Sequence, residues 1–293
     1  MKRIVTIQDI SCVGKCSLTV ALPIISAMGV ETAIIPTAVL STHTMFQGFT
    51  FHDLTAEIEP ISAHWKKERI AFDAIYTGYL GSFEQIHLMK KLFEDFGGKD
   101  CVCVVDPCMA DNGSLYKGFD QNFAFEMAKL AKHADVLLPN ITEASYLLGV
   151  PYKKAGDYDE AYIKNLIEAL SKLGAKRIVL KGVEFAEEQN TFKGVCGKIG
   201  IVSYDTASGK YESYFHKKLS QNFHGTGDIF ASVCVGALMR NMPLKDAYSL
   251  AADFVVEAIK ATLAYEGHNT YGVDFETVFP YLIERLQKLP TKK

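Results

Sequence analysis

The chain has 293 residues, of which 48% are hydrophobic and 22% are charged, and its formal net charge at pH 7 is −3. This composition is typical of a globular protein with a sizeable core and excludes an intrinsically disordered chain. The small net charge gives no electrostatic reason to expect a nucleic acid or an anionic membrane surface as a partner.

The start of the sequence lacks the long apolar stretch of a signal peptide, and no later apolar run reaches the length of a membrane span. The chain contains seven cysteines, and this odd number cannot pair completely within one chain. Without a secretion signal, cysteines are best interpreted as reduced thiols. We therefore expect a cytoplasmic protein without a disulfide framework.

Short β-branched runs alternate with helical patterns along most of the chain. Strands are predicted over residues 3–8, 31–36, 74–77, 102–106, 136–139 and 177–181. Helices are predicted over residues 82–96, 122–133, 159–173, 228–240 and 244–264. Several of the strands are apolar without alternation, as strands buried on both faces are. The pattern predicts an α/β fold with a mostly parallel sheet that carries helices on its faces.

Two further features concern organisation. Residues 199–204 and 211–215 flank a polar turn in which Gly209 is well placed for a left-handed conformation, and this predicts a small hairpin near residues 199–215. No linker, repeat or change of composition divides the chain, so we expect a single domain over residues 1–293. In open parallel sheets, ligands bind outside the carboxyl ends of the strands.

The first strand runs into a polar segment rich in small residues, which contains Gln8, Asp9, Ser11 and Ser17. Such a segment could hold a small polar substrate. By itself the structural alternative is favoured, in which the segment is a loop and Ser17 or Ser11 caps the following helix.

Two later segments combine polar and aromatic side chains. His43 and Thr44 lie in a run of hydroxyls, an imidazole and an aromatic ring, which suits an aromatic heterocycle that needs hydrogen bonds and a stacking face. Tyr79 follows a strand, between Gly78 and Gly81, which allow close backbone approach. An ordinary loop histidine and a packing tyrosine are the structural alternatives.

Three strand ends carry groups suited to phosphate or a hard cation. Asp106 and Asp111 could organise waters around a divalent ion, although an Asp-Pro pair also starts turns. Asn140 and Glu143 have the spacing of a capping box, and they could equally direct an amide and a carboxylate toward Mg²⁺ and phosphate. Lys181 is a candidate cation for phosphate oxygens, although an exposed lysine at a strand end is common.

The tetrapeptide Gly225, Thr226, Gly227 and Asp228 precedes a long apolar run. Glycines allow a tight turn, and the free N–H groups of a helix start stabilise negative charge. Asp228 could accept the proton of an attacking hydroxyl. For the tetrapeptide alone, a loop with an acidic helix cap is the favoured interpretation. Together with Asp106 and Glu143, phosphoryl transfer to a small alcohol becomes the better one.

These motifs occur in an order that carries a resemblance. They are Ile7-Gln8 and the segments at residues 41–44, 77–82, 106–107, 139–143 and 225–228. From Ile4 to about Thr262, the chain resembles the ribokinase-like superfamily, and most closely its pyridoxal kinase branch. The resemblance implies a three-layer α/β/α fold that phosphorylates the 5′-hydroxymethyl group of a vitamin B6 vitamer with ATP and Mg²⁺. It also implies a homodimer, and a monovalent cation is a further candidate cofactor.

The resemblance also implies residue roles. Asp228 is the general base, and the backbone N–H groups of Gly225, Thr226 and Gly227 form an anion hole. The residues expected around the pyridine ring are Gln8, Asp9, His43, Thr44 and Tyr79. Those expected at ATP are Asp106, Asp111, Asn140, Lys181 and Thr226, and those expected at the metal are Glu143 and Asp106. The segment after Asp111 resembles a loop that closes over the substrate, with Gly113 and Gly118 as hinges.

Two positions bear on substrate choice. Asp9 stands where many pyridoxal kinases have serine, and we hypothesise that its carboxylate favours a cationic group, such as the amine of pyridoxamine or a protonated ring nitrogen. Asp228 stands where the related hydroxymethylpyrimidine kinases usually have cysteine, which favours the pyridoxal branch.

Other functions stay open. The first alternative is another kinase of the same superfamily, acting on hydroxymethylpyrimidine or on a sugar. The segments at residues 41–44 and 77–82 argue against a sugar and only modestly against the pyrimidine. The second alternative is a non-catalytic vitamer-binding or regulatory protein on the same fold, and the presence of Asp228 and Glu143 disfavours it.

Overall fold

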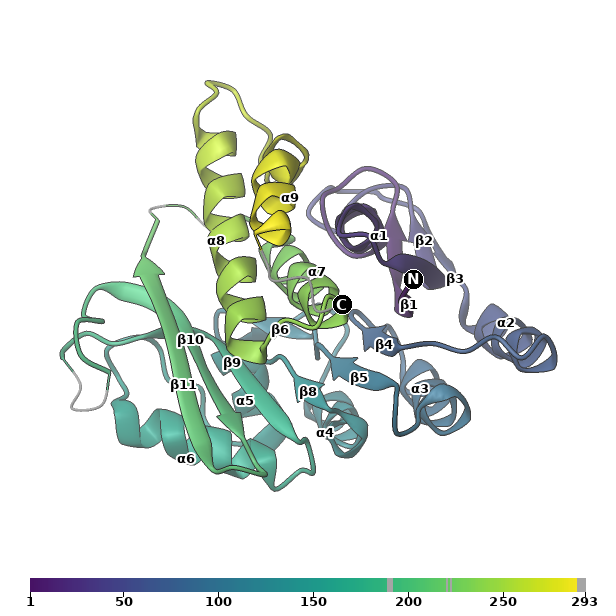
Figure 1. Cartoon of the computed structure of the whole chain (residues 1–293), viewed down its shortest axis with the longest axis horizontal. Helices are drawn as coiled ribbons and strands as arrows, with labels where there is room; N and C mark the ends of the chain where they lie inside the picture. The colour runs from purple at the N-terminus through teal and green to yellow at the C-terminus, as the bar shows by residue number, and fades with distance from the viewer. Residues whose placement is uncertain (189–191, 220, 222, 289–293) are drawn as a thin grey trace. The chain divides into compact units, whose positions relative to one another are not determined.

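The computed structural model describes residues 1–188, 192–219, 221 and 223–288 (Figure 1). The chain forms two compact units, of which the first combines Met1–Ala74 with the segment from Leu219 onward and the second comprises Ile75–Lys218. The single domain over residues 1–293 stays a prediction.

The first unit contains strands and helices from both ends of the chain. They are β1 (Arg3–Ser11), α1 (Leu18–Ala27), β2 (Glu31–Leu40), β3 (Phe51–Asp53), α2 (Thr55–Lys67), α7 (Thr226–Met239), α8 (Leu244–Leu263), the 3₁₀ helix η2 (Phe275–Val278) and α9 (Phe279–Gln287). Strand β1 pairs in parallel with β2, and β3 runs antiparallel to β2. Strand β1 is buried along almost its whole length, and its buried residues include the polar side chains of Gln8 and Asp9.

Helix α7 is the buried helix of this unit. It is apolar on all sides and packs against α1 and α8 (Figure 1). Its N-cap is Gly225, which has a φ of 75°. The helix therefore starts before residue 228, where the sequence predicted its start. This earlier start places Asp228 inside the first turn.

The second unit contains the middle of the chain. Its elements are β4 (Ala74–Thr77), α3 (Phe83–Phe96), β5 (Val102–Val105), β6 (Ala110–Asp111), β7 (Ser114–Leu115), α4 (Gln121–Ala128), the 3₁₀ helix η1 (Ala131–His133), β8 (Val136–Leu137), α5 (Ile141–Leu148), α6 (Glu160–Ser171), β9 (Arg177–Glu184), β10 (Lys198–Asp205) and β11 (Lys210–Lys217). Its strands in the large sheet lie in the order β11-β10-β9-β8-β5-β4, and β6 pairs with β7 in a separate two-stranded sheet. Strands β5, β8 and β9 pair in parallel, and β10 is antiparallel to both of its neighbours.

The predicted hairpin is confirmed as β10 and β11, with Gly209 at a φ of 67° in its turn (Figure 1). The helix predicted over residues 122–133 is wrong in its second half, where α4 ends at Ala128 and η1 follows. The tighter turn lets the chain leave the helix at Ala134, whose backbone is already extended toward β8.

Neighbouring strand ends of the second unit are joined by backbone hydrogen bonds. The N–H of Asp106 donates to the carbonyl of Thr77 at 2.9 Å, and the N–H of Lys181 donates to the carbonyl of Pro139 at 2.8 Å. Asn140 and Lys181 form a parallel bridge. The polar segments that follow β4, β5 and β8 therefore lie side by side, as the rule for parallel sheets predicts.

The fold class is the predicted one: an α/β fold with a large, mostly parallel central sheet flanked by helices. Helix α2 is not among the predicted helices, and it contains Pro60, a residue disfavoured inside helices. Within the part of the chain that the structure describes, no helix combines the length and the apolar character needed to cross a bilayer.

Candidate active site

The carboxylate of Asp9, near the end of β1, is the centre of a buried polar cluster. Its Oδ1 accepts a hydrogen bond from the Ser17 hydroxyl at 2.5 Å, and its Oδ2 accepts one from the Ser11 hydroxyl at 3.2 Å. Burial raises the pKa of Asp9, and the two hydroxyls offset part of this rise. Both serine hydroxyls therefore donate hydrogen bonds to one buried carboxylate. Ser17 stands at the N-cap of α1, as the structural alternative predicted, but its side chain makes no capping hydrogen bond.

Ser17 also contacts Asp228, the predicted base. Its backbone N–H donates to Oδ2 of Asp228 at 2.9 Å, so one residue contacts two buried carboxylates. Ser17 has a φ of 51°, which is uncommon for a residue with a side chain. The hydroxyl of Ser232, one turn along α7, donates to the carbonyl of Asp228 at 2.6 Å.

The thiol of Cys16 belongs to the same cluster. Burial raises the pKa of Cys16 to about 12, and the negative charges of Asp228 and Asp9 contribute to the rise. The thiol is therefore neutral at physiological pH and is not activated as a nucleophile.

The turn at residues 225–227 has the features of an anion site. The first N–H groups of a helix have no acceptor within the helix, and the helix dipole is positive at this end. The Thr226 hydroxyl donates to the carbonyl of Phe223 at 3.1 Å. A Cβ atom at Gly227 would meet no atom within 4 Å, so there is open space beside this part of the backbone. The turn can therefore accommodate a bulky anion such as a phosphoryl group.

The other ring-binding candidates of the first unit differ in their environments. His43 is half-buried, with its ring centroid 4.9 Å from that of His224. Burial lowers the pKa of His43, and His224 lowers it further, so the ring is neutral at pH 7. Thr44 is exposed. Gln8 is fully buried and donates to the Thr6 hydroxyl at 2.8 Å, and its Oε1 has no hydrogen-bond partner among the described residues.

Tyr79, the remaining ring-binding candidate, belongs to the second unit. It is half-buried, and its ring centroid lies 5.7 Å from that of Phe119. The five residues expected around the pyridine ring are thus divided between the units, with four in the first unit.

An ion pair is the centre of the second cluster. The Lys181 Nζ lies 3.1 Å from Oδ1 and 2.9 Å from Oδ2 of Asp106, and both side chains are largely buried. Burial alone would lower the pKa of Lys181, but the carboxylates of Asp106 and Glu143 outweigh it and raise the pKa. Burial raises the pKa of Asp106, and Lys181 opposes this rise. Lys181 is therefore a fixed positive charge at the strand ends.

Glu143 accepts two backbone hydrogen bonds. Its Oε2 accepts from the N–H of Asn140 at 2.8 Å and its Oε1 from the N–H of Met109 at 3.3 Å, while its own N–H donates to Oδ1 of Asn140 at 2.8 Å. The capping box is therefore confirmed. Burial raises the pKa of Glu143 to about 8, Lys181 opposes the rise and Asp106 adds to it.

A hydrogen bond connects the segment after Asp106 to the start of α5, where Asn140 is the N-cap. The side-chain amide of Asn140 donates to the carbonyl of Ala110 at 2.9 Å. Asp111 is exposed, and its carboxylate accepts hydrogen bonds from the backbone and side chain of Asn112. Asn112 and Gly113 both have positive φ, as a tight turn between β6 and β7 requires. The predicted closing loop thus includes a small hairpin.

The second cluster fits a metal ion that arrives with phosphate. Among the described residues, no group of three or more histidine, cysteine, aspartate and glutamate side chains is arranged to hold a metal ion. Asp106 and Glu143 provide hard oxygen donors, and Lys181 contacts both oxygens of Asp106. Mg²⁺ usually binds through one or two carboxylates together with waters and phosphates, which is compatible with this pair.

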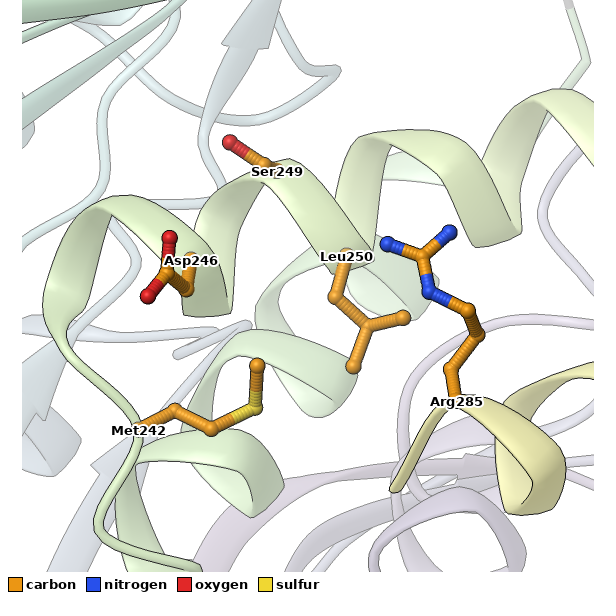
Figure 2. Close-up of a pocket in the computed structure, with 5 residues that line it drawn as sticks. All are labelled: Met242, Asp246, Ser249, Leu250 and Arg285. Atoms are coloured by element: carbon orange, nitrogen blue, oxygen red, sulfur yellow. The ribbon is translucent and has the colours of Figure 1, made fainter. Parts of the chain in front are cut away.

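A separate pocket of about 200 Å³ lies within the first unit. Met242, Asp246, Ser249, Leu250 and Arg285 line it, from α8, α9 and the turn before α8 (Figure 2). Arg285 donates to Asp253 at 3.2 Å and to the Tyr281 hydroxyl at 2.6 Å. None of the site residues predicted from the sequence lines this pocket.

The fold agrees with the comparisons with known proteins. The family described as phosphomethylpyrimidine kinase matches residues 22–273. The chain belongs to this family. It is therefore a kinase of the ribokinase-like superfamily, as its motifs predicted.

The relatives of this family member include two substrate classes. A Bacteroides thetaiotaomicron protein assigned as a phosphomethylpyrimidine kinase, in a crystal form with pyridoxal, is 38% identical with a TM-score of 0.89, covering 100% of this chain and 97% of that one. The Lactobacillus plantarum pyridoxal kinase is 31% identical with a TM-score of 0.85, covering 97% and 98%. A hydroxymethylpyrimidine/phosphomethylpyrimidine kinase of Haemophilus influenzae is 26% identical, covering 92% and 95%. Family membership alone therefore does not choose between a B6 vitamer and the pyrimidine.

Sequence reasoning missed several residues of the clusters. The contact of the Ser17 N–H with Asp228 and the ion pair of Lys15 with Asp274 each join residues more than 200 positions apart. No local pattern indicates such pairs. The one local signal was the polar composition of residues 8–17, which indicated a candidate substrate site although a capped loop was the favoured interpretation.

Proposed function

We propose that this protein is an ATP-dependent kinase that phosphorylates the 5′-hydroxymethyl group of a B6 vitamer, pyridoxal, pyridoxamine or pyridoxine. The observation that carries the proposal is the buried carboxylate of Asp228 in the first turn of α7, next to the turn at residues 225–227. A carboxylate beside free helix N–H groups can deprotonate an alcohol while the N–H groups stabilise the transferring phosphoryl group.

The proposed reaction is an in-line phosphoryl transfer. Asp228 accepts the proton of the hydroxymethyl group as its oxygen forms a bond to the γ-phosphorus of ATP. The bond between that phosphorus and the oxygen bridging to the β-phosphate breaks, and ADP leaves with the electron pair. The backbone N–H groups of Gly225, Thr226 and Gly227 stabilise charge on the equatorial oxygens. Asp228 then releases its proton to solvent.

The groups proposed for the nucleotide lie mainly in the second unit. Lys181 is proposed to supply positive charge, and Asn140, Asp111 and Thr226 are proposed to supply polar contacts. Mg²⁺, held by Glu143 and Asp106 together with phosphate oxygens, would neutralise phosphate charge. Because Glu143 binds two N–H groups, it already has a fixed orientation before the nucleotide arrives.

The proposed ring-binding residues are Gln8, Asp9, His43, Thr44 and Tyr79. Asp9 is the specificity-determining member, because its carboxylate is buried among neutral serine hydroxyls. A cationic substrate group would compensate its charge better than a neutral group would. The homodimer, the monovalent cation and the cytoplasmic location stay predictions.

A second candidate function is phosphorylation of hydroxymethylpyrimidine. The family match and the Haemophilus influenzae relative favour it. The aspartate at position 228 and the similarity to the Lactobacillus plantarum pyridoxal kinase favour the B6 vitamer. A non-catalytic vitamer-binding protein is disfavoured, since binding alone requires no base.

A panel assay tests the proposal. ATP consumption and product mass are measured with pyridoxal, pyridoxamine, pyridoxine, hydroxymethylpyrimidine and ribose, with Mg²⁺ present. We expect the highest kcat/KM for a B6 vitamer. A higher kcat/KM for hydroxymethylpyrimidine would replace the first candidate with the second. Binding of a vitamer without turnover of any alcohol would indicate the non-catalytic alternative.

A further inference from the structure

Lys15 lies in the loop between β1 and α1, where Gly225 and Gly272 approach it closely. A Cβ atom at Gly225 would lie 1.7 Å from the carbonyl oxygen of Lys15, and one at Gly272 would lie 2.4 Å from the Lys15 Cβ. Both close approaches are possible only because glycine has no side chain. The backbone of Lys15 therefore lies directly against the turn that starts α7.

The side chain of Lys15 is anchored in the C-terminal part of the chain. Its Nζ lies 2.6 Å from Oδ1 of Asp274 and 2.8 Å from Oε2 of Glu276. The side chains of Lys15 and Asp274 are 17% and 25% exposed, whereas that of Glu276 is 51% exposed. Because solvent weakens exposed ion pairs, Asp274 is the stronger partner.

Asp274 is itself fixed by two further contacts. Its backbone N–H donates to the Thr262 hydroxyl at 2.7 Å, and its Oδ1 accepts from the side chain of Asn269 at 3.1 Å. Burial alone would lower the pKa of Lys15, but hydrogen bonds to Asp274 and Glu276 raise it. Lys15 is therefore a charged anchor.

Two residues after Lys15, the N–H of Ser17 binds Asp228. Ser17 itself has a φ of 51°, which is strained for a residue with a side chain. Such conformations persist only where surrounding contacts hold them. We propose that Lys15 is a positioning residue: its ion pair with Asp274 holds the loop so that the Ser17 N–H stays on the Asp228 carboxylate and the loop supports Gly225. This inference rests on the proposed role of Asp228.

Loss of the ion pair between Lys15 and Asp274 should lower kcat more than it weakens substrate binding. A small displacement of a catalytic group costs rate because reacting atoms must be aligned closely. For Lys15→Met we expect kcat to fall about 10- to 100-fold, with both KM values changed less than about threefold. Asp274→Asn should act in the same direction. Lys15→Arg should retain most of the activity, since it keeps the charge.

The test compares these full-length variants with the wild type and with Glu276→Gln, the matched control at the exposed partner. Steady-state kinetics give kcat and KM, and thermal unfolding shows that each variant folds. Hydrogen exchange of the peptide containing Ser17 provides a readout independent of activity. We expect exchange at least about tenfold faster in Lys15→Met and Asp274→Asn than in Glu276→Gln.

The two hypotheses fail in different ways. If the wild type phosphorylates no alcohol of the panel, the proposed function fails, and exchange at Ser17 still decides whether Lys15 holds the loop. Unchanged exchange in both Lys15→Met and Asp274→Asn would overturn the inference. Wild-type kcat in Lys15→Met, in an enzyme that Asp228→Ala inactivates, would overturn it as well.

Discussion

The backbone N–H of Ser17 and the carboxylate of Asp228 are joined by a 2.9 Å hydrogen bond across 211 positions of the sequence. The same serine places its hydroxyl 2.5 Å from Asp9. One strained residue therefore connects the proposed base with the residue proposed to select the substrate. Both roles can be tested separately, because Asp228 and Asp9 can be replaced one at a time.

Replacing the base should abolish most of the turnover. For Asp228→Ala we expect kcat to fall on the order of 10²-fold or more, with substrate binding retained, because a missing general base slows proton transfer. Steady-state kinetics and a vitamer-binding titration measure the two effects. Asp246→Ala is the matched control, since Asp246 lies in the first turn of α8 at the separate pocket (Figure 2). Near-wild-type kcat in Asp228→Ala would disprove the base assignment.

Removing the Asp9 carboxylate should change substrate preference. For Asp9→Ser we expect the ratio of kcat/KM for pyridoxamine to that for pyridoxal to fall about tenfold, because a partly desolvated charge pair is lost. The kinetics of both vitamers are compared in wild type, Asp9→Ser and Ser11→Ala. Ser11→Ala removes one hydrogen bond to Asp9 and keeps its charge. An unchanged ratio in Asp9→Ser would show that Asp9 does not select a cationic group.

A side chain at Gly225 should destabilise the protein. Alanine would place its Cβ 1.7 Å from the Lys15 carbonyl at a backbone φ of 75°. We expect Gly225→Ala to lower the free energy of unfolding by about 2 kcal/mol or more. Gly227→Ala is the control, because a Cβ there meets no atom within 4 Å and alanine favours helices. Urea denaturation measures both, and equal stability of the two variants would refute the steric argument.

The pKa of Glu143 should make stability depend on pH. Because burial raises this pKa to about 8 in the folded protein, from an ordinary value of 4.5, the folded state holds a proton that the unfolded state releases between these values. The contribution of this proton to the free energy of unfolding is fully present below pH 4.5 and is lost as the pH rises toward 8. Relative to the wild type, Glu143→Gln should therefore gain about 1–3 kcal/mol between pH 5 and pH 8, since it cannot ionise.

Urea denaturation at several pH values between 5 and 8 measures this difference. Glu126→Gln is a suitable control, because the Glu126 carboxylate forms surface ion pairs with Lys129 and Lys90, which lower its pKa. A stability difference between Glu143→Gln and the wild type that stays constant over this range would show that Glu143 is already ionised in the folded protein.

Local features of the fold could be predicted from the sequence because they depend on neighbouring residues. The alternation of apolar runs and helical patterns indicated the α/β class, and the turn at Gly209 and the capping box of Asn140 and Glu143 follow from backbone preferences over a few residues. The sequence also indicated the turn at Gly225, since a left-handed residue before a helix favours glycine.

Only the tertiary structure decided which polar groups meet. The hydrogen bond between Ser17 and Asp228, the ion pair of Lys15 with Asp274 and that of Lys181 with Asp106 join residues 211, 259 and 75 positions apart. Their burial sets which carboxylates hold protons, and burial depends on packing. The sequence by itself therefore determined the elements and their turns, and the packing of distant segments decided the charges of the site.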